Sequence, residues 1–175
     1  MKILYVTSRL PFGPGEAFII PELRGLINQG HEILIVPLLP RGTIIHDDMR
    51  PFLHCVERTA FLSLQELAAA ASVFFKGFPE TLRFFSYILR ASQGIRRVKN
   101  LLMFPRALWL SALAASWGAH HIHAHWATTP TTVAMIAGEL RGIPWSFTAH
   151  RGDIVEGDLL STKCSKAAFI RVISR

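Results

Sequence analysis

The chain has 175 residues, half of them apolar, and a formal net charge of +7. This composition excludes a disordered chain, which would be poorer in aliphatic residues, and it predicts one domain with a packed core. We expect neither a secretory signal, nor a spanning helix of roughly 20 apolar residues, nor a disulfide framework, because Cys55 and Cys164 match no CxxC pattern.

The first forty residues predict a strand, a helix and a second strand. KILYVT at residues 2–7 and HEILIVPLL at residues 31–39 are short apolar runs typical of buried strands. Between them, apolar residues recur at helical spacing from Glu16 to Gln29, with Pro21 at the helix start or at a kink. This order opens a parallel sheet with a right-handed crossover.

The middle of the chain predicts mainly helices. Pro40–Pro51 is expected to be a polar loop, and Cys55–Phe61 is a candidate for a short third strand. Three helices are expected to follow, separated by glycine and proline residues, at Leu64–Lys76, Thr81–Ser92 and Arg96–Trp117.

After residue 120 strands and helices alternate again. The expected strands are HIHAHW at 121–126, PWSFTAH at 144–150 and AAFIRVIS at 167–174, with helices at Thr129–Leu140 and Asp158–Lys166. This alternation predicts an α/β fold, a Rossmann-like doubly wound parallel sheet with helices on both faces. Because the sequence stops on an apolar strand that no helix follows, we expect residues 1–175 to be one domain of a longer protein.

Positive charge is concentrated in one stretch. No Asp or Glu occurs from Thr81 to Gly138, where cations alternate with bulky apolar residues. The cations are Arg83, Arg90, Arg96, Arg97, Lys99 and Arg106. The pattern fits an anionic membrane surface, and it fits equally a pair of ordinary amphipathic helices with a solvated basic face. Nucleic acid is a weaker candidate partner, because no recognition-helix or aromatic–basic RNA motif is present.

The loop after the first strand carries Gly13 and Gly15 at the spacing of the first two glycines of GxGxxG. Phe18 stands where the third glycine would be, and no acidic residue ends the second strand, so a dinucleotide site is not expected. The loop leads into a helix whose first N–H groups favour an anion such as a phosphate. A plain turn is the alternative.

Three histidines, His121, His123 and His125, point to one face of the third apolar strand. Their rings would spread over about 13 Å, too far for one tetrahedral zinc ion, so no metal site is expected. His125 lies at the carboxyl end of the strand, where open α/β sheets bind ligands, whereas His121 and His123 are expected to be structural. The following threonines are expected to cap the next helix and offer hydroxyls to a ligand: Thr128, Thr129, Thr131 and Thr132.

A second polar group follows the strand that ends at His150. We expect Arg151 and Asp153 to lie in a loop at the same edge of the sheet. Arg can bind a phosphate through two N–H groups, His can donate a hydrogen bond or transfer a proton, and Asp can orient a hydroxyl. A surface loop with an internal Arg–Asp contact is the alternative.

Three segments resemble motifs of the family 4 glycosyltransferases of the exopolysaccharide and colanic-acid type. GEAFIIPELRGLINQGHEI (15–33) is similar to their opening SETFI..E...L...GHEV, with Gly15 and Ala17 replacing the usual Ser and Thr. HIHAHWATTPTTVAMIAGELRGIPWSFTAHRGDI (121–154) resembles H.HAHF...PA..A......GIP.SFTAH..DI, with Arg151-Gly152 replacing a commonly small–basic pair. AAFIRVISR (167–175) resembles A.FV..IS, and residues 43–117 are the least characteristic part.

The resemblance implies a GT-B architecture, in which two Rossmann-like domains face each other across a cleft. Residues 1–175 would be the N-terminal domain, which binds the acceptor, and a donor-binding domain outside this chain would hold the nucleotide-sugar. Transfer would retain the anomeric configuration and need no metal or other cofactor. By the same resemblance His150 would lie beside the transferred sugar as the catalytic residue. The residues expected to bind substrate are Gly13, Gly15, Glu16, His125, Thr129, Arg151 and Asp153.

The expected function is hexose transfer to a saccharide in surface polysaccharide assembly. The family's acceptors are often lipid-linked, so we expect a cytoplasmic protein, at most peripheral on the inner face of the membrane. Residues 1–175 alone are expected to be inactive. The alternative is a non-catalytic Rossmann- or flavodoxin-like module that binds a phosphorylated ligand or an anionic membrane surface; such a module should cover its last strand with its own helix.

Overall fold

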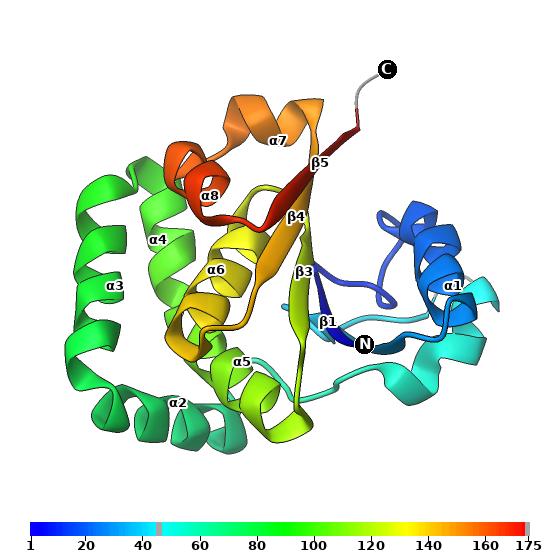
Figure 1. The fold of residues 1–175 in the computed structure, drawn as a ribbon, viewed down its shortest axis with the longest axis horizontal. Helices are drawn as coiled ribbons and strands as arrows, with labels where there is room; N and C mark the ends of the chain where they lie inside the picture. The colour runs from blue at the N-terminus through cyan, green and yellow to red at the C-terminus, as the bar shows by residue number, and fades with distance from the viewer. Residues whose placement is uncertain (45–46, 174–175) are drawn as a thin grey trace.

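The computed structural model describes residues 1–44 and 47–173, which form a five-stranded sheet with all strands parallel. The strand order is β2-β1-β3-β4-β5 (Figure 1). The strands are β1 Lys2–Thr7, β2 Glu32–Pro37, β3 His121–His125, β4 Trp145–His150 and β5 Phe169–Ile173. The predicted α/β fold with a Rossmann-like parallel sheet is therefore confirmed.

Helices connect the strands in the described part of the chain. The α-helices are α1 Ile20–Asn28, α2 Leu64–Lys76, α3 Phe78–Ala91, α4 Gly94–Leu102, α5 Phe104–Trp117, α6 Thr129–Arg141, α7 Arg151–Glu156 and α8 Leu160–Lys166. Two 3-10 helices are η1 Ala17–Ile19 and η2 Asp47–Cys55. Helix α1 has Pro21 in its first turn, where its missing N–H costs no intrahelical hydrogen bond.

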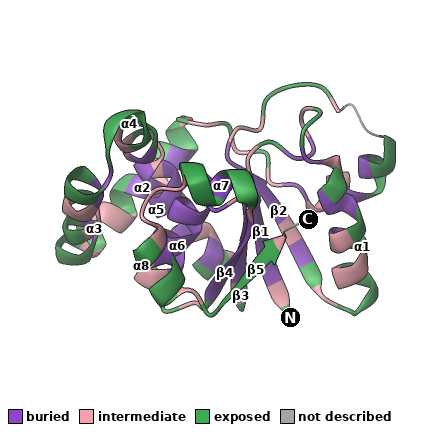
Figure 2. Cartoon of the chain, turned by 90° about the horizontal axis from the view of Figure 1, so that it is seen from above, coloured by how far each residue is buried: buried purple, intermediate pink, exposed green. Residues whose placement is uncertain are grey.

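Two apolar clusters cover opposite faces of the sheet. On one face, α5 and α6 pack against the side chains of Leu4, Ile122 and Phe147. On the other face, α1 and η2 bury Tyr5 and Ile35 of β1 and β2. Figure 2 shows β1, β3, β4 and α5–α6 as the most buried part of the chain, whereas β5 is exposed.

The helices α2, α3 and α4 form a further layer outside α5 and α6 (Figure 1). A buried ion pair ties this layer to the sheet, because Arg106 of α5 lies 2.9 Å from Glu66 of α2 and also donates to the carbonyl of Pro37 at the end of β2. The layer thus has a fixed position beside the carboxyl ends of the strands.

Several sequence predictions about the middle of the chain are wrong. The third strand at Cys55–Phe61 is reduced to one parallel bridge between Val56 and Ile35, because η2 occupies most of the connection. The polar loop Pro40–Pro51 likewise enters η2 from Asp47, while residues 45–46 lie outside the described residues. The single helix Arg96–Trp117 is two helices, with a break at Met103 before Pro105.

Strand β5 also differs from the expected buried strand. Phe169, Ile170 and Val172 are 53%, 37% and 58% exposed, because β5 is an edge strand and α1 contacts that side of the sheet mainly over β1. Ser174, predicted as its last residue, lies outside the described residues.

Candidate functional site

The loop after β1 is organised around the carboxylate of Glu16. Its two oxygens accept hydrogen bonds from the backbone N–H groups of Ser8, Arg9 and Leu10 at 3.0, 2.7 and 2.7 Å, and from the indole N–H of Trp126 at 2.6 Å. Glu16 is 5% exposed. These backbone donors lie directly after β1 and not at the helix start where an anion was predicted, and the protein's own carboxylate occupies them.

His125 and His150 meet at the carboxyl ends of β3 and β4, with their Nε2 atoms 2.9 Å apart. The His150 ring accepts the backbone N–H of Asp153, and since Nε2 faces His125, the acceptor is Nδ1. His150 therefore carries its proton on Nε2 and donates it to His125. His125 in turn donates from Nδ1 to the hydroxyl of Tyr5 at 3.3 Å, and burial together with the nearby carboxylate of Glu22 raises the pKa of Tyr5.

In this chain of hydrogen bonds His125 must be neutral, and burial supplies that condition. Burial lowers the pKa of His125 to about 3, because the charged form cannot be solvated there. His125 is 1% exposed, so it reaches a ligand only through His150. In this arrangement both ring nitrogens of His150 are engaged, and its Nε2–H can serve a ligand only when the bond to His125 opens.

The other two strand histidines have side-chain partners within the sheet, as the structural assignment predicted. His123 bonds to Ser146 at 2.8 Å and to Thr148 at 3.0 Å, and His121 bonds to the same Ser146 hydroxyl at 2.7 Å. Burial lowers the pKa of His123 to about 3 and also lowers the pKa of His121. In the described residues, no group of three or more His, Cys, Asp or Glu side chains is arranged to hold a metal ion.

Asp153 lies in the first turn of α7, not in the predicted loop. Its carboxylate accepts the backbone N–H groups of His150 at 3.0 Å and of Ala127 at 3.3 Å, so it joins the ends of β3 and β4. Asp153 is buried and structural in these contacts, whereas Arg151 is exposed at the start of the same helix.

The threonines at the start of α6 differ in their roles. Thr131 and Thr132 donate to the carbonyls of Trp126 and Thr128, so these hydroxyls are used inside the fold. Thr128 is the N-cap residue, but no side-chain capping hydrogen bond is formed, contrary to prediction. Thr128 and Thr129 instead line a cavity.

Two cavities open along this carboxyl edge, and both include Ser8. One, of about 210 Å³, is lined by the glycine loop with Gly13 and Gly15, together with Arg9 and Trp126. The other, of about 340 Å³, is mostly apolar. It is lined by Ser8, Leu38, Leu39, Phe61, Lys99, Leu102, Met103, Thr128, Thr129 and Pro130. Both cavities have mainly apolar walls, and the first also carries the charged side chains of Arg9 and Glu16.

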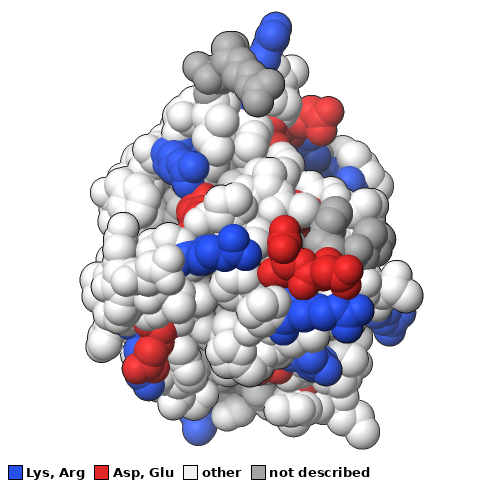
Figure 3. All heavy atoms as spheres, turned by 90° about the vertical axis from the view of Figure 1, so that its right-hand side faces the viewer, with Lys and Arg blue, Asp and Glu red and all other residues white. Residues whose placement is uncertain are grey.

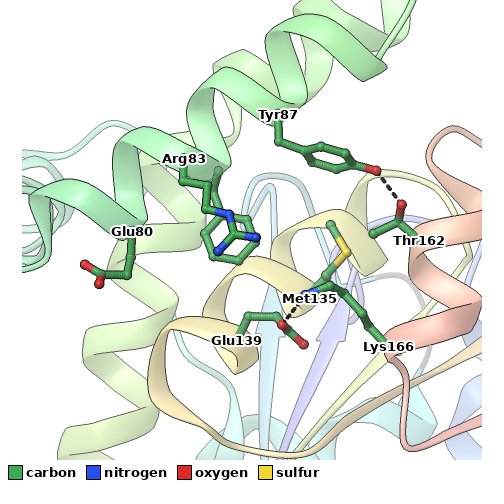
Figure 4. A pocket seen from close by; sticks show the side chains of 8 residues that line it. Glu80, Arg83, Tyr87, Met135, Glu139, Thr162 and Lys166 are labelled. Atoms are coloured by element: carbon green, nitrogen blue, oxygen red, sulfur yellow. Dashed lines mark hydrogen bonds and ion pairs between the residues drawn. The ribbon is translucent and has the colours of Figure 1, made fainter.

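A cavity of about 360 Å³ lies away from this edge, between α3, α6 and α8 (Figure 4). Tyr87 of α3 reaches across it to Thr162 of α8, and Lys166 of α8 pairs with Glu139 of α6. These contacts hold the helices together, and they leave few polar groups to recognise a ligand.

Sequence reasoning missed several residues of the carboxyl-edge cluster. Phe18 packs its ring against His125, Trp126 and His150, at centroid distances of 5.3, 5.7 and 5.4 Å. Lys163 of α8 is buried and donates to the carbonyls of Ala127 and Thr128, and burial lowers its pKa to about 7. No local pattern marks these residues, because each acts on a segment distant in the sequence.

In comparisons with known proteins, no protein-family model matches the chain, and no curated protein matches its sequence. Within the described residues, no helix is both long enough and apolar enough to cross a membrane.

Proposed function

We propose that this chain is the acceptor-binding domain of a retaining glycosyltransferase, one half of a GT-B enzyme that transfers a hexose from a nucleotide-sugar to a saccharide. The supporting observation is that the first two segments resembling family 4 motifs meet at the carboxyl edge, and that the third forms β5, which pairs with the strand ending at His150. Glu16 from the first segment binds Trp126 from the second, and His125 binds His150 at the far end of that second segment.

The two cavities at this edge support an acceptor role. A saccharide needs hydroxyl-binding groups, which the glycine loop, Ser8 and Thr129 supply, and an attached lipid needs the apolar walls of the second cavity. His150 is half-buried at this edge between the rings of Phe18 and Trp126. We propose that a sugar hydroxyl replaces His125 as the acceptor of the His150 Nε2–H.

In this proposal, a donor-binding domain supplied by residues outside 1–175 provides the rest of the active site.

The experiment compares sugar transfer by residues 1–175 with transfer by the reading frame extended beyond residue 175. The donors are radiolabelled UDP-hexoses and GDP-hexoses, and the acceptor is a bacterial lipid extract. We expect transfer only from the extended protein. Comparable rates from residues 1–175 would contradict the two-domain proposal.

The same assay tests His150. His150→Ala in the extended protein is expected to abolish transfer while the melting temperature of residues 1–175 stays within a few degrees. His54→Ala, at an exposed histidine in η2, is the matched control and should keep full activity. Full activity of His150→Ala would remove this residue from the site.

A further inference from the structure

The helices α3 and α4 expose apolar side chains in rows. On α3 the row is Phe78, Leu82, Phe85 and Leu89, which are 47%, 42%, 37% and 46% exposed. Their spacing of four, three and four residues places them on one side of the helix. On α4 the row is Ile95, Val98 and Leu102, which are 66%, 49% and 56% exposed. We call these seven residues the apolar ridge.

Helix α4 leaves several of its apolar residues exposed. Its buried side carries Asn100, which donates to Ser92 at 3.1 Å and to Asp158 at 2.9 Å, while Leu101 packs against the core. A surface helix of a globular protein usually turns its apolar stripe inward, whereas Ile95, Val98 and Leu102 of α4 face outward. Such an arrangement indicates that the outer side meets another apolar phase.

Cations flank the apolar ridge. They are Arg83, Arg90, Arg96 and Lys99, all exposed, and none of them has a hydrogen bond or ion pair with a side chain in the described part of the chain. Glu80 is the one acidic residue on the two helices. On the side of the molecule that carries α1, by contrast, acidic and basic side chains lie next to each other (Figure 3).

We propose that α3 and α4 dock this protein onto a membrane surface that contains anionic lipid. The ridge would enter the boundary between headgroups and acyl chains, and the flanking cations would contact lipid phosphates. A second copy of the chain fits less well, because two basic surfaces would face each other. The docking does not depend on the proposed sugar transfer, since it needs only the surface of α3 and α4.

Docking has a geometric consequence for the carboxyl-edge cavity. Leu102 belongs to the ridge and Lys99 to its flanking cations, and both also line the apolar cavity of about 340 Å³. A lipid-linked molecule could therefore pass from the bilayer to the cavity without crossing water. This link, unlike the docking, rests on the proposed function.

The test is co-sedimentation of the 175-residue chain with phosphatidylcholine vesicles that contain either no phosphatidylglycerol or about 30% of it. We expect binding to the anionic vesicles only, and weaker binding as salt is raised from about 0.1 M to 1 M, because the screening length falls from about 10 Å to 3 Å. No sedimentation of the wild-type chain with anionic vesicles would overturn the proposal.

Two double variants separate the apolar and electrostatic contributions. Leu89→Ser with Ile95→Ser is expected to weaken binding more than about tenfold. Arg90→Gln with Arg96→Gln is expected to weaken it about 25-fold, from about fivefold for each cation. All four residues are exposed, so the variants should keep the wild-type melting temperature.

Matched controls change the same residue types elsewhere. Val155→Ser with Val172→Ser removes apolar groups that are 78% and 58% exposed, and Arg24→Gln with Arg41→Gln removes exposed cations. Binding should be unchanged in both. Equal losses in controls and test variants would overturn the proposal, as would a ridge variant that changes only the oligomeric state in light scattering. Tighter binding to single-stranded DNA than to anionic vesicles would also overturn it.

Discussion

Replacing Glu16 by Gln should destabilise the whole fold, although the two side chains have the same shape. The carboxylate accepts four N–H donors, two on each oxygen, and Gln keeps only one oxygen. Its amide NH₂ would therefore face two N–H groups that it cannot accept. Hydrogen bonds to a charged group contribute about 1.5–3 kcal/mol each, so losing two predicts a destabilisation of about 3 kcal/mol or more.

The assay is urea unfolding followed by circular dichroism, with a thermal melt as a second readout. For a chain of this length, 3 kcal/mol corresponds to a fall in melting temperature of about 6–12 °C. Glu32→Gln on β2 is the matched control, because its side chain is 68% exposed and its ion pair with Lys2 spans 3.6 Å. A change below about 0.5 kcal/mol in Glu16→Gln would refute the structural role assigned to this carboxylate.

A double-mutant cycle isolates the contact between Glu16 and Trp126. Trp126→Phe removes the indole N–H that lies 2.6 Å from Glu16 and keeps an aromatic ring. We expect the destabilisation of the double variant to be smaller than the sum of the two single changes by about 1 kcal/mol. Full additivity would mean that the contact contributes nothing to stability.

Two further predictions concern the sheet and its helices. His123 and His125 stay neutral in the folded state because burial lowers their pKa values to about 3, whereas in the unfolded chain they take up protons below a pKa of about 6.5. Folding stability should therefore fall with pH from about 6.5 toward 3, by about 3–4 kcal/mol between pH 7 and pH 5. Urea unfolding at pH 7 and pH 5 measures this loss of stability. As a control, His54→Asn, at an exposed histidine, should show the same dependence of unfolding free energy on pH. Equal stability at both pH values would contradict neutral His123 and His125 rings in the folded state. Gly138→Ala should destabilise the fold by about 1–3 kcal/mol, because the added Cβ would lie 2.7 Å from the Trp145 ring. Gly25→Ala on α1 is the control: its Cβ would meet nothing within 4 Å, so the change should be neutral or slightly stabilising. Equal melting temperatures for the two variants would contradict the close packing of Gly138 against Trp145.

The apolar strands and the first helix could be predicted because their signals are local. β1 and β2 are continuous apolar runs, whereas β3 and β4 alternate apolar residues with His, Ser or Thr, and the structure pairs all four in parallel. The third strand could not be excluded in this way, since Cys55–Phe61 has a strand-like composition. Its failure to pair depends on η2, whose apolar residues Met49 and Phe52 pack under the sheet.

The candidate site was predictable only in part. The position of a residue along a strand indicates that it lies at the carboxyl edge of the sheet, but it does not indicate which side chain it contacts there. His125, His150 and Asp153 do meet at the carboxyl edge as expected from parallel pairing. That Glu16 binds backbone N–H groups and Trp126, instead of facing a ligand, depends on a contact across 110 residues. Contacts between residues this far apart in the sequence produce no local periodic pattern from which they could be predicted.

The interior position of β1 in the sheet has a consequence for folding during synthesis. β1 pairs with β2 on one side, but its other neighbour is β3, and the partner of Ile3 there is His121. At about 5–20 residues per second, a ribosome needs roughly 6–24 seconds to make the intervening segment. Throughout that interval one edge of this buried strand has no partner, and an unpaired strand edge exposed during synthesis is prone to aggregation.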